Sequence, residues 1–317
     1  MFWTGELIAR SAPIRRRVTA ERSPLAERAV AAYVGLAIGD ALGATVEFMT
    51  PKEIRTHYGV HENITGGGWL RLKPGQVTDD TTMALALGES ILAAGRVDAL
   101  AAADAFDAWM RAKPVDIGNT VRRNLVSFRS SRNPEAPLSE HDAGNGAAMR
   151  LLPVALACYG QARDDVIAAS RAQAHVTHHN PLSDAACETL IFMIQDFLAG
   201  RDALTVEREH AAALVAAFPV FAWDRKHSEN PSGYVVETVQ AVFQSLFATE
   251  CFEDCLIDIV NRGGDADTTG AIAGMLAGAR YGLDGIPRRW LRSLDELTRV
   301  RCEKQAEALI ALSGRAA

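Results

Sequence analysis

Two short segments each place two aspartates and a threonine directly at the start of an apolar stretch. These residues are Thr78, Asp79 and Asp80 in the first segment and Asp265, Asp267 and Thr268 in the second. Each segment alone is explained as a helix start, where oxygen acceptors and acids are favoured. Capping needs one acceptor, however, and four carboxylates in one pocket would repel each other unless a cation neutralised them. If the fold brings both segments together, their hard oxygen ligands predict two bound Mn²⁺ or Mg²⁺ ions.

A third motif places glycines at every fourth position. Gly35, Gly39 and Gly43 would line one face of a helix, and this spacing is typical of close contact between two helices. Glu47 follows just beyond that helix. It is either a solvated acid or an acid at the rim of a site.

The segments that must position these residues are predicted to be helical. Apolar residues recur every three or four positions in most of the chain, as at Val235, Val239, Val242 and Leu246, and alanine is abundant in these segments. Period-two alternation over five or more residues is hard to find. We expect an all-α protein of about a dozen helices. Residues 24–317 would form a compact, single-domain bundle, and residues 1–23 a flexible, Arg-rich tail.

The composition excludes several classes of protein. The 317 residues carry a net charge of −6, which argues against a basic nucleic-acid binder. Hydrophobic residues make up 48%, too many for a disordered chain. The five cysteines form no C-x-x-C motif and indicate reduced thiols in the cytoplasm. The longest uncharged, mostly apolar run spans about 13 residues, whereas a transmembrane helix needs about 20. We expect no transmembrane segment.

Six motifs, which include the segments described above, follow one another along the chain. They read GDALGATVEF, TGGGWLRLKPGQVTDDT, PVDIGNT, AGNGAAMR, THHNPLSDAAC and GGDADTTGAIAGMLAG. Together they resemble the ADP-ribosylglycohydrolase family, and within it the members that act on dinitrogenase reductase. The similarity runs from about residue 25 to about residue 312. It implies an orthogonal all-α bundle with two Mn²⁺ or Mg²⁺ ions in a cleft.

The resemblance also implies a role for each matching position. The implied metal ligands are Thr78, Asp79, Asp80, Asp265, Asp267 and Thr268. Glu47 matches an acid near the metals on a mobile segment, and Asp116 matches a carboxylate near the scissile bond. The implied substrate-binding residues are Asn119, Gly144, Asn145, Gly146, His178 and Tyr234. His175 and His179 are so close in sequence to His178 that either could be the histidine that matches the family position.

Charge is consistent with these assignments. An acidic pocket would repel the diphosphate of ADP-ribose unless metals reversed the local sign. The Gly144–Asn145–Gly146 loop precedes a helix expected over Ala147 to Tyr159, and glycine amides at a helix N-terminus suit an anion. Taken singly, the loop is also explained as an ordinary helix start. Asp116 is also explained as a turn or capping residue, and His178 as a satisfied, non-catalytic histidine.

The implied reaction is hydrolysis of the N-glycosidic bond between ribose C1″ and an arginine of dinitrogenase reductase. A metal-activated water would be the nucleophile. Asp116 would position the departing guanidinium, and Glu47 is the candidate base or gate. The resemblance implies two further partners, a PII-type signalling protein and, through it, a membrane ammonium channel. We expect a cytoplasmic monomer whose membrane association is reversible and depends on these partners.

Three alternatives stay open at this point. The acceptor of ADP-ribose could be another protein, another side chain or a small compound. The chain could bind ADP-ribose without turning it over. The acids could be helix caps in a plain helical scaffold.

Overall fold

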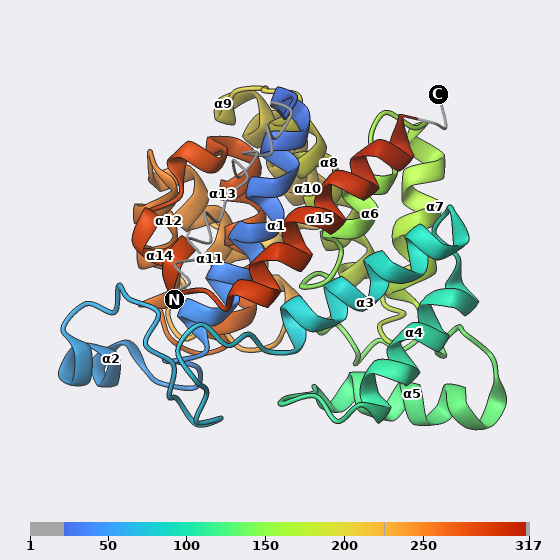
Figure 1. Ribbon diagram of the computed structural model, residues 1–317, viewed down its shortest axis with the longest axis horizontal. Helices are drawn as coiled ribbons and strands as arrows, with labels where there is room; N and C mark the ends of the chain where they lie inside the picture. The colour runs from blue at the N-terminus through green and yellow to red at the C-terminus, as the bar shows by residue number, and fades with distance from the viewer. Residues whose placement is uncertain (1–21, 225, 315–317) are drawn as a thin grey trace, which may run out of the picture.

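The computed structural model describes residues 22–224 and 226–314, and within them the chain is almost entirely helical (Figure 1). The helices of this part are α1 (Pro24–Gly43), α2 (Pro51–Tyr58), α3 (Asp79–Ala94), α4 (Ala99–Arg111), α5 (Asn119–Ser131), α6 (Leu152–Ala157), α7 (Arg163–Ala174), α8 (Pro181–Leu198), α9 (Ala203–Val206), α10 (Ala212–Ala217), α11 (Val235–Ala248), α12 (Phe252–Val260), α13 (Ala266–Tyr281), α14 (Arg288–Ser293) and α15 (Glu296–Ser313). One π-helical segment, Glu207–Ala211, and two 3-10 segments, Pro219–Phe221 and Leu283–Gly285, complete them. The predicted all-α class is confirmed.

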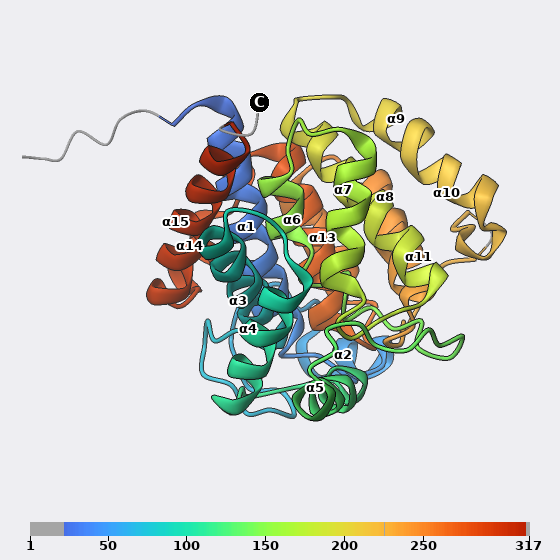
Figure 2. The same cartoon turned by 90° about the vertical axis from the view of Figure 1, so that its right-hand side faces the viewer.

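The centre of the bundle is an antiparallel pair of helices, α1 and α13, which lie side by side in both views (Figures 1 and 2). Their backbones touch along the glycine face predicted from the sequence. A Cβ atom on Gly35 would lie 2.3 Å from the carbonyl oxygen of Gly274, and one on Gly43 would lie 2.1 Å from that of Ala266. Only glycine permits such an approach. The contact therefore holds the end of α1 beside the start of α13.

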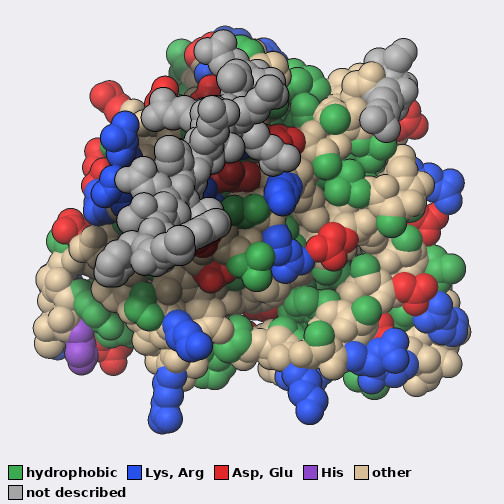
Figure 3. All heavy atoms as spheres, viewed as in Figure 1, with side chains coloured by type: hydrophobic (Ala, Val, Ile, Leu, Met, Phe, Trp, Pro, Cys, Tyr) green, Lys and Arg blue, Asp and Glu red, His purple; other side chains and the backbone are tan. Residues whose placement is uncertain are grey.

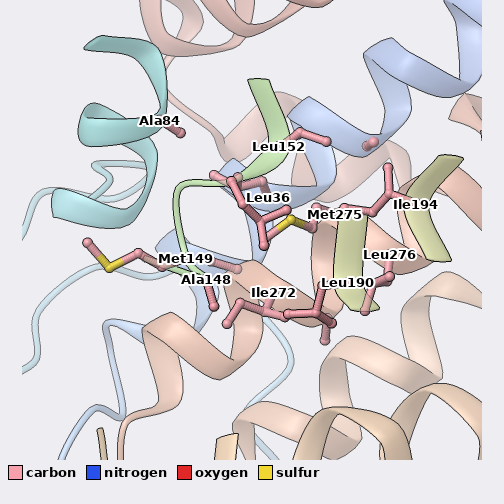
Figure 4. Close-up of a cluster of buried hydrophobic side chains, with 14 of the residues drawn as sticks. Leu36, Ala84, Ala148, Met149, Leu152, Leu190, Ile194, Ile272, Met275 and Leu276 are labelled. Carbon is pink, nitrogen blue, oxygen red and sulfur yellow. The ribbon is translucent and has the colours of Figure 1, made fainter. Parts of the chain in front are cut away.

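The hydrophobic core surrounds this pair (Figure 4). Leu36 of α1 and Ile272 and Met275 of α13 are completely buried, and Leu190 of α8 and Leu152 of α6 are buried with them. α15 packs on α1 and α3, while α11 and α12 cover α13. Burial of this much apolar surface stabilises the frame on which the loops at one end are mounted.

α3, α4 and α5 form a second group of helices beside the central pair. α3 packs on α4, and α4 on α5. α2 and α5 lie together at one end of the molecule, while α9 and α10 lie towards the other (Figure 2). On the face shown in Figure 3, Lys and Arg side chains are interspersed with Asp and Glu. None of the helices described is long and apolar enough to cross a membrane.

The structure shortens one expected helix and places the last residues of the expected tail. The helix expected over Ala147 to Tyr159 was wrong in its extent, because residues 145–150 form turns and α6 covers only Leu152–Ala157. Pro153 lies in the first turn of α6, where its missing N–H costs nothing. Most of the predicted tail, residues 1–21, lies outside the described residues. Its last two residues contact the bundle, since Ser23 caps α1 and Arg22 forms an ion pair with Glu307 at 2.6 Å.

Candidate active site

The start of α3 is docked onto α1 through one buried carboxylate, that of Asp40. Its oxygens accept hydrogen bonds from the backbone N–H groups of Thr78 and Thr81, at 3.0 and 3.1 Å, and from both threonine hydroxyls, at 2.9 and 2.5 Å. The Thr78 side chain makes no capping bond to its own helix. Asp40 therefore fixes the turn that carries Asp79 and Asp80. It was not among the predicted site residues.

The start of α13 depends on the two glycines that precede Asp265. Gly263 and Gly264 have φ angles of +72° and +66°, a conformation that favours glycine. The Gly264 carbonyl accepts from the Phe48 N–H at 2.7 Å, and the Gly264 N–H donates to the Met49 carbonyl at 3.0 Å. This pairing ties the segment after α1 to the first turn of α13.

The two predicted ligand groups meet where these helix starts converge. Carboxylate oxygens of Glu47, Asp265 and Asp267 lie within 4.8 Å of one another. Asp80 is close enough to Asp265 and Asp267 for their charges to repel each other. It is 1% exposed, and the Thr78 hydroxyl lies 3.2 Å from its carboxylate. None of these four acids forms an ion pair with a Lys or Arg in the described part of the chain.

Burial and mutual repulsion strongly disfavour the charged forms of these acids. Burial, reinforced by the charge of Asp116, raises the pKa of Asp79 to about 7. Burial also raises the pKa of Glu47 to about 8, although the hydrogen bond from Trp69 opposes the shift. The pKa values of Asp80 and Asp267 are raised well above the ordinary range by burial and then by neighbouring carboxylates. The cluster therefore lacks a compensating positive charge.

The chemistry of this donor set fits hard divalent cations. The Oδ1 atom of Asp80 is buried and has no hydrogen-bond partner, although buried polar atoms are normally paired. The donors around it are carboxylate and hydroxyl oxygens, which suit Mg²⁺ or Mn²⁺. The six residues predicted as ligands are thus gathered at one place, and their assignment as ligands stays a prediction.

A cavity of about 340 Å³ opens above the cluster. The predicted site residues that line it are Glu47, Asp79, Asp116, Asn119, Gly144, Asn145, Gly146, His178, Asp265, Asp267 and Thr268. Thr78 and Asp80 lie buried behind this wall. Tyr234 is not among the lining residues, but it pairs with Gly144 through an isolated β-bridge and is 37% exposed.

The glycine loop on the cavity wall is joined directly to the acidic cluster. The amide of Asn145 donates to Asp265 Oδ2 at 2.6 Å and to the Thr238 hydroxyl at 3.0 Å. Because α6 begins only at Leu152, the loop does not open a long helix, as the sequence had suggested. The Asn145 N–H is also occupied, since it donates to the Gly233 carbonyl at 3.0 Å.

The His178 ring packs directly against the Gly144–Asn145–Gly146 loop. A Cβ atom on Gly146 would lie 2.6 Å from its ring, and one on Gly144 would lie 2.9 Å from it. Burial lowers the pKa of His178 to about 3, so the ring is neutral at physiological pH. His175 and His179 instead stack on each other, with ring centroids 3.8 Å apart, beside Glu135. The structure thus separates His178 from its two neighbours.

Asp116 and Asn119 come from the turn that leads into α5. Asp116 is half-buried and accepts a hydrogen bond from the Ile117 N–H at 2.7 Å. Asn119 is exposed at the first position of α5. Since Asp116 has no ion-pair partner among the described residues, its carboxylate is free to meet a cationic group in the cavity.

Comparison with known proteins agrees with this site. The chain belongs to the ADP-ribosylglycohydrolase family, whose family model matches residues 21–317. It is 51% identical to the ADP-ribosyl-[dinitrogen reductase] glycohydrolase of Rhodospirillum rubrum, over 91% of this chain and 97% of that one. It is 33% identical to the ADP-ribosylarginine hydrolase Tri1 of Serratia proteamaculans, over 86% and 77%.

A solved structure gives the same result for the fold. The ADP-ribosylglycohydrolase-related protein complex superposes with a TM-score of 0.80 at 35% identity, and the match covers 92% of this chain and 99% of that one. The family and the fold predicted from the motifs are therefore confirmed.

Proposed function

We propose that this chain is a metal-dependent hydrolase that removes ADP-ribose from an arginine of ADP-ribosylated dinitrogenase reductase and so reactivates it. The observation that carries the proposal is the crowding of Glu47, Asp79, Asp265 and Asp267 at a cavity whose wall also holds the Gly144–Asn145–Gly146 loop. The identity to the Rhodospirillum rubrum enzyme, which covers nearly the full length of both chains, supports the same acceptor.

The proposed metal centre holds two Mn²⁺ or Mg²⁺ ions. The ligands would be Thr78, Asp79, Asp80, Asp265, Asp267 and Thr268, all of which lie in or directly behind the cavity wall. When bound, the ions supply Lewis acidity, lower the pKa of a water molecule and offset the negative charge of the substrate diphosphate.

Three side chains of the cavity have separate roles in the reaction. Water adds to ribose C1″ and the bond from C1″ to the guanidinium nitrogen breaks. The departing nitrogen gains one proton, which balances the proton that the attacking water loses. Glu47 takes the proton of the attacking water, and the indole N–H of Trp69, at 2.7 Å, holds its carboxylate in place. Asp116 pairs with the guanidinium, whose forked donors match a carboxylate. Buried, neutral His178 keeps the Gly144–Asn145–Gly146 loop in position under the ADP-ribosyl group.

Several finer predictions accompany this proposal. A PII-type signalling protein and a membrane ammonium channel stay predicted partners, and no residue is assigned to either contact. The monomeric state, the cytoplasmic location with reversible membrane association, and the single domain over residues 24–317 are likewise predictions.

The decisive experiment measures release of ADP-ribose from ADP-ribosylated dinitrogenase reductase. We expect release with Mn²⁺, little release in excess chelator, and loss of release in an Asp79→Asn variant. Asp284→Asn is the matched control, because Asp284 is exposed on a short segment outside the cavity. Equal turnover in excess chelator would contradict the proposal.

A second acceptor is also supported by a relative. The Tri1 enzyme of Serratia proteamaculans is named as an ADP-ribosylarginine hydrolase, so the chain could act on arginine-linked ADP-ribose in other proteins. Assaying several ADP-ribosylated proteins beside dinitrogenase reductase distinguishes the two. Comparable kcat/KM values for all of them would favour the broader function.

A further inference from the structure

Two large aromatic side chains project into solvent beside the acidic cavity. Phe48 is 64% exposed and Trp69 is 53% exposed, and their ring centroids lie 5.5 Å apart. Most aromatic side chains of this size are largely buried in folded proteins, since each can remove 150–250 Å² from water. Two exposed rings in mutual contact therefore require an explanation beyond folding.

The backbone of Phe48 has a conformation that bulky residues rarely adopt. Its φ angle is +62°, an outlier for a bulky residue and one that costs of order 1 kcal/mol. The hydrogen bond from the Phe48 N–H to the Gly264 carbonyl, at 2.7 Å, fixes this conformation. The strain does not serve to bury the ring, because the residue stays 64% exposed.

The loop that carries Trp69 is constructed around three left-handed glycines. Gly66, Gly67 and Gly68 all have positive φ angles. A Cβ atom on Gly68 would lie 2.4 Å from the Ala44 carbonyl oxygen, so the loop is held against the end of α1. Its shape leaves the indole ring half-exposed and directs the indole N–H towards Glu47.

Phe48 lies at the cavity, and Trp69 contacts both the Phe48 ring and the Glu47 carboxylate beside it. Phe48 lines the cavity together with Glu47 and Asp116, and these two acids are the proposed groups nearest the scissile bond. Val115, next to Asp116, is also exposed, at 42%. Each of the two acids thus has an exposed apolar residue next to it in the sequence.

We propose that Phe48 and Trp69 form a docking surface for the polypeptide that carries the ADP-ribosylated arginine. This inference rests on the proposed function, because the acceptor is defined by that reaction. Aromatic side chains are the residues that most often anchor protein interfaces, and their faces also attract the cationic side chains of an arginine-bearing segment. ADP-ribose itself would occupy the cavity and would not need either ring.

The test compares a protein substrate with a small one. The enzyme, loaded with Mn²⁺, is assayed on ADP-ribosylated dinitrogenase reductase and on free ADP-ribosylarginine, as wild type and as Phe48→Asn. Asparagine tolerates a positive φ angle, so the turn is kept and the ring is lost. We expect kcat/KM for the protein substrate to fall about tenfold more than kcat/KM for ADP-ribosylarginine, mainly through KM.

Two further variants separate docking from local damage. Phe48→Tyr keeps the ring, and we expect it to retain the ratio of the two kcat/KM values found for the wild type. Leu204→Ser removes an exposed apolar side chain, 72% exposed on α9, which lies far from α2 and α5 (Figure 2). It should leave both kcat/KM values unchanged.

Three results would overturn the proposal. They are an equal loss on both substrates, no loss on the protein substrate, and a wild-type dimer that Phe48→Asn converts to a monomer. If the wild type hydrolyses neither substrate, the proposed function fails. Docking is then judged by affinity for the ADP-ribosylated protein, which Phe48→Asn should weaken about tenfold.

Discussion

Gly39 of α1 and Gly270 of α13 are in direct backbone contact. A Cβ atom on Gly39 would lie 1.9 Å from the carbonyl oxygen of Gly270, and one on Gly270 would lie 2.5 Å from that of Gly39. The contact lies one residue from Asp40 and three residues from Asp267. The helix separation therefore sets the spacing of the acidic cluster.

Gly39→Ala should destabilise the fold by about 3 kcal/mol or more, because neither backbone can yield to the added methyl group without separating the helices. Chemical denaturation measures the change in the free energy of unfolding. Gly314→Ala is the control, since an added Cβ there meets its nearest atom at 4.0 Å. A loss below about 1 kcal/mol for Gly39→Ala would show that the helix pair can adjust.

Asp80→Asn should stabilise the metal-free protein and abolish stabilisation by Mn²⁺. The substitution removes a buried acid whose ionised form is strongly disfavoured and whose Oδ1 atom has no partner. It also removes a predicted ligand. Relief of one pKa unit of unfavourable charging corresponds to about 1.4 kcal/mol. Thermal unfolding with chelator and with Mn²⁺ measures both effects. If Mn²⁺ raises the Tm of this variant as much as that of the wild type, Asp80 is not a ligand.

The metal-free protein should lose stability as the pH rises from 6.5 to 8. In the folded state the pKa of Asp79 is about 7 and that of Glu47 about 8, above their ordinary values of 3.8 and 4.5. The folded state therefore binds more protons than the unfolded state, so the stability contributed at low pH is lost as the pH passes through 7 and 8. His178 opposes this trend only near pH 6.5, because burial lowers its pKa in the folded state while the unfolded imidazole is still partly protonated there.

Urea unfolding at pH 6.5, 7.2 and 8.0 measures this dependence. We expect a fall of about 1 kcal/mol or more in excess chelator. We expect a smaller fall with Mn²⁺, since cations bound at the predicted ligands would keep Asp79 ionised throughout this range. A rise in stability over this range in chelator would contradict the raised pKa values.

Asp40→Asn should weaken Mn²⁺ binding about 10- to 100-fold, the usual effect of losing a group that orients a metal ligand. The asparagine amide cannot accept all the bonds that Thr78 and Thr81 donate to Asp40. Isothermal titration calorimetry measures the affinity. Asp98→Asn serves as the control, because Asp98 caps α4 and asparagine caps equally well. An unchanged affinity would limit Asp40 to a structural role.

Trp69→Phe should move the ascending limb of the pH–rate profile to higher pH. The hydrogen bond from the indole N–H lowers the pKa of Glu47, so losing it should leave less ionised base at neutral pH. Rates of ADP-ribosylarginine hydrolysis between pH 6 and 9 measure the shift. Trp223→Phe changes the same residue type outside the cavity, and its profile should match that of the wild type. An unshifted Trp69→Phe profile would exclude Glu47 as the titrating base.

The sequence predicted the parts of this protein that depend on local pattern. Glycines at Gly35, Gly39 and Gly43 indicated a close helix contact, and the structure supplies the partner helix. Asp40 was missed because nothing local distinguishes a buried acid within an apolar helix. Its role appears only when the start of α3 is placed against α1. The helix expected over Ala147 to Tyr159 was too long, because residues 145–150 instead form turns beside Gly233 and Asp265.

The side-chain amide of Asn145 links the substrate cavity to the predicted metal site. It lies in the loop beside the substrate cavity, yet its nitrogen donates to Asp265 at 2.6 Å. A ligand that moves the loop would also change the hydrogen bond from Asn145 to Asp265. The same hydrogen bond orients the Asp265 carboxylate towards a bound cation. Loading with Mn²⁺ and occupancy by nucleotide are thus thermodynamically linked, and each should tighten or loosen the other by the same factor.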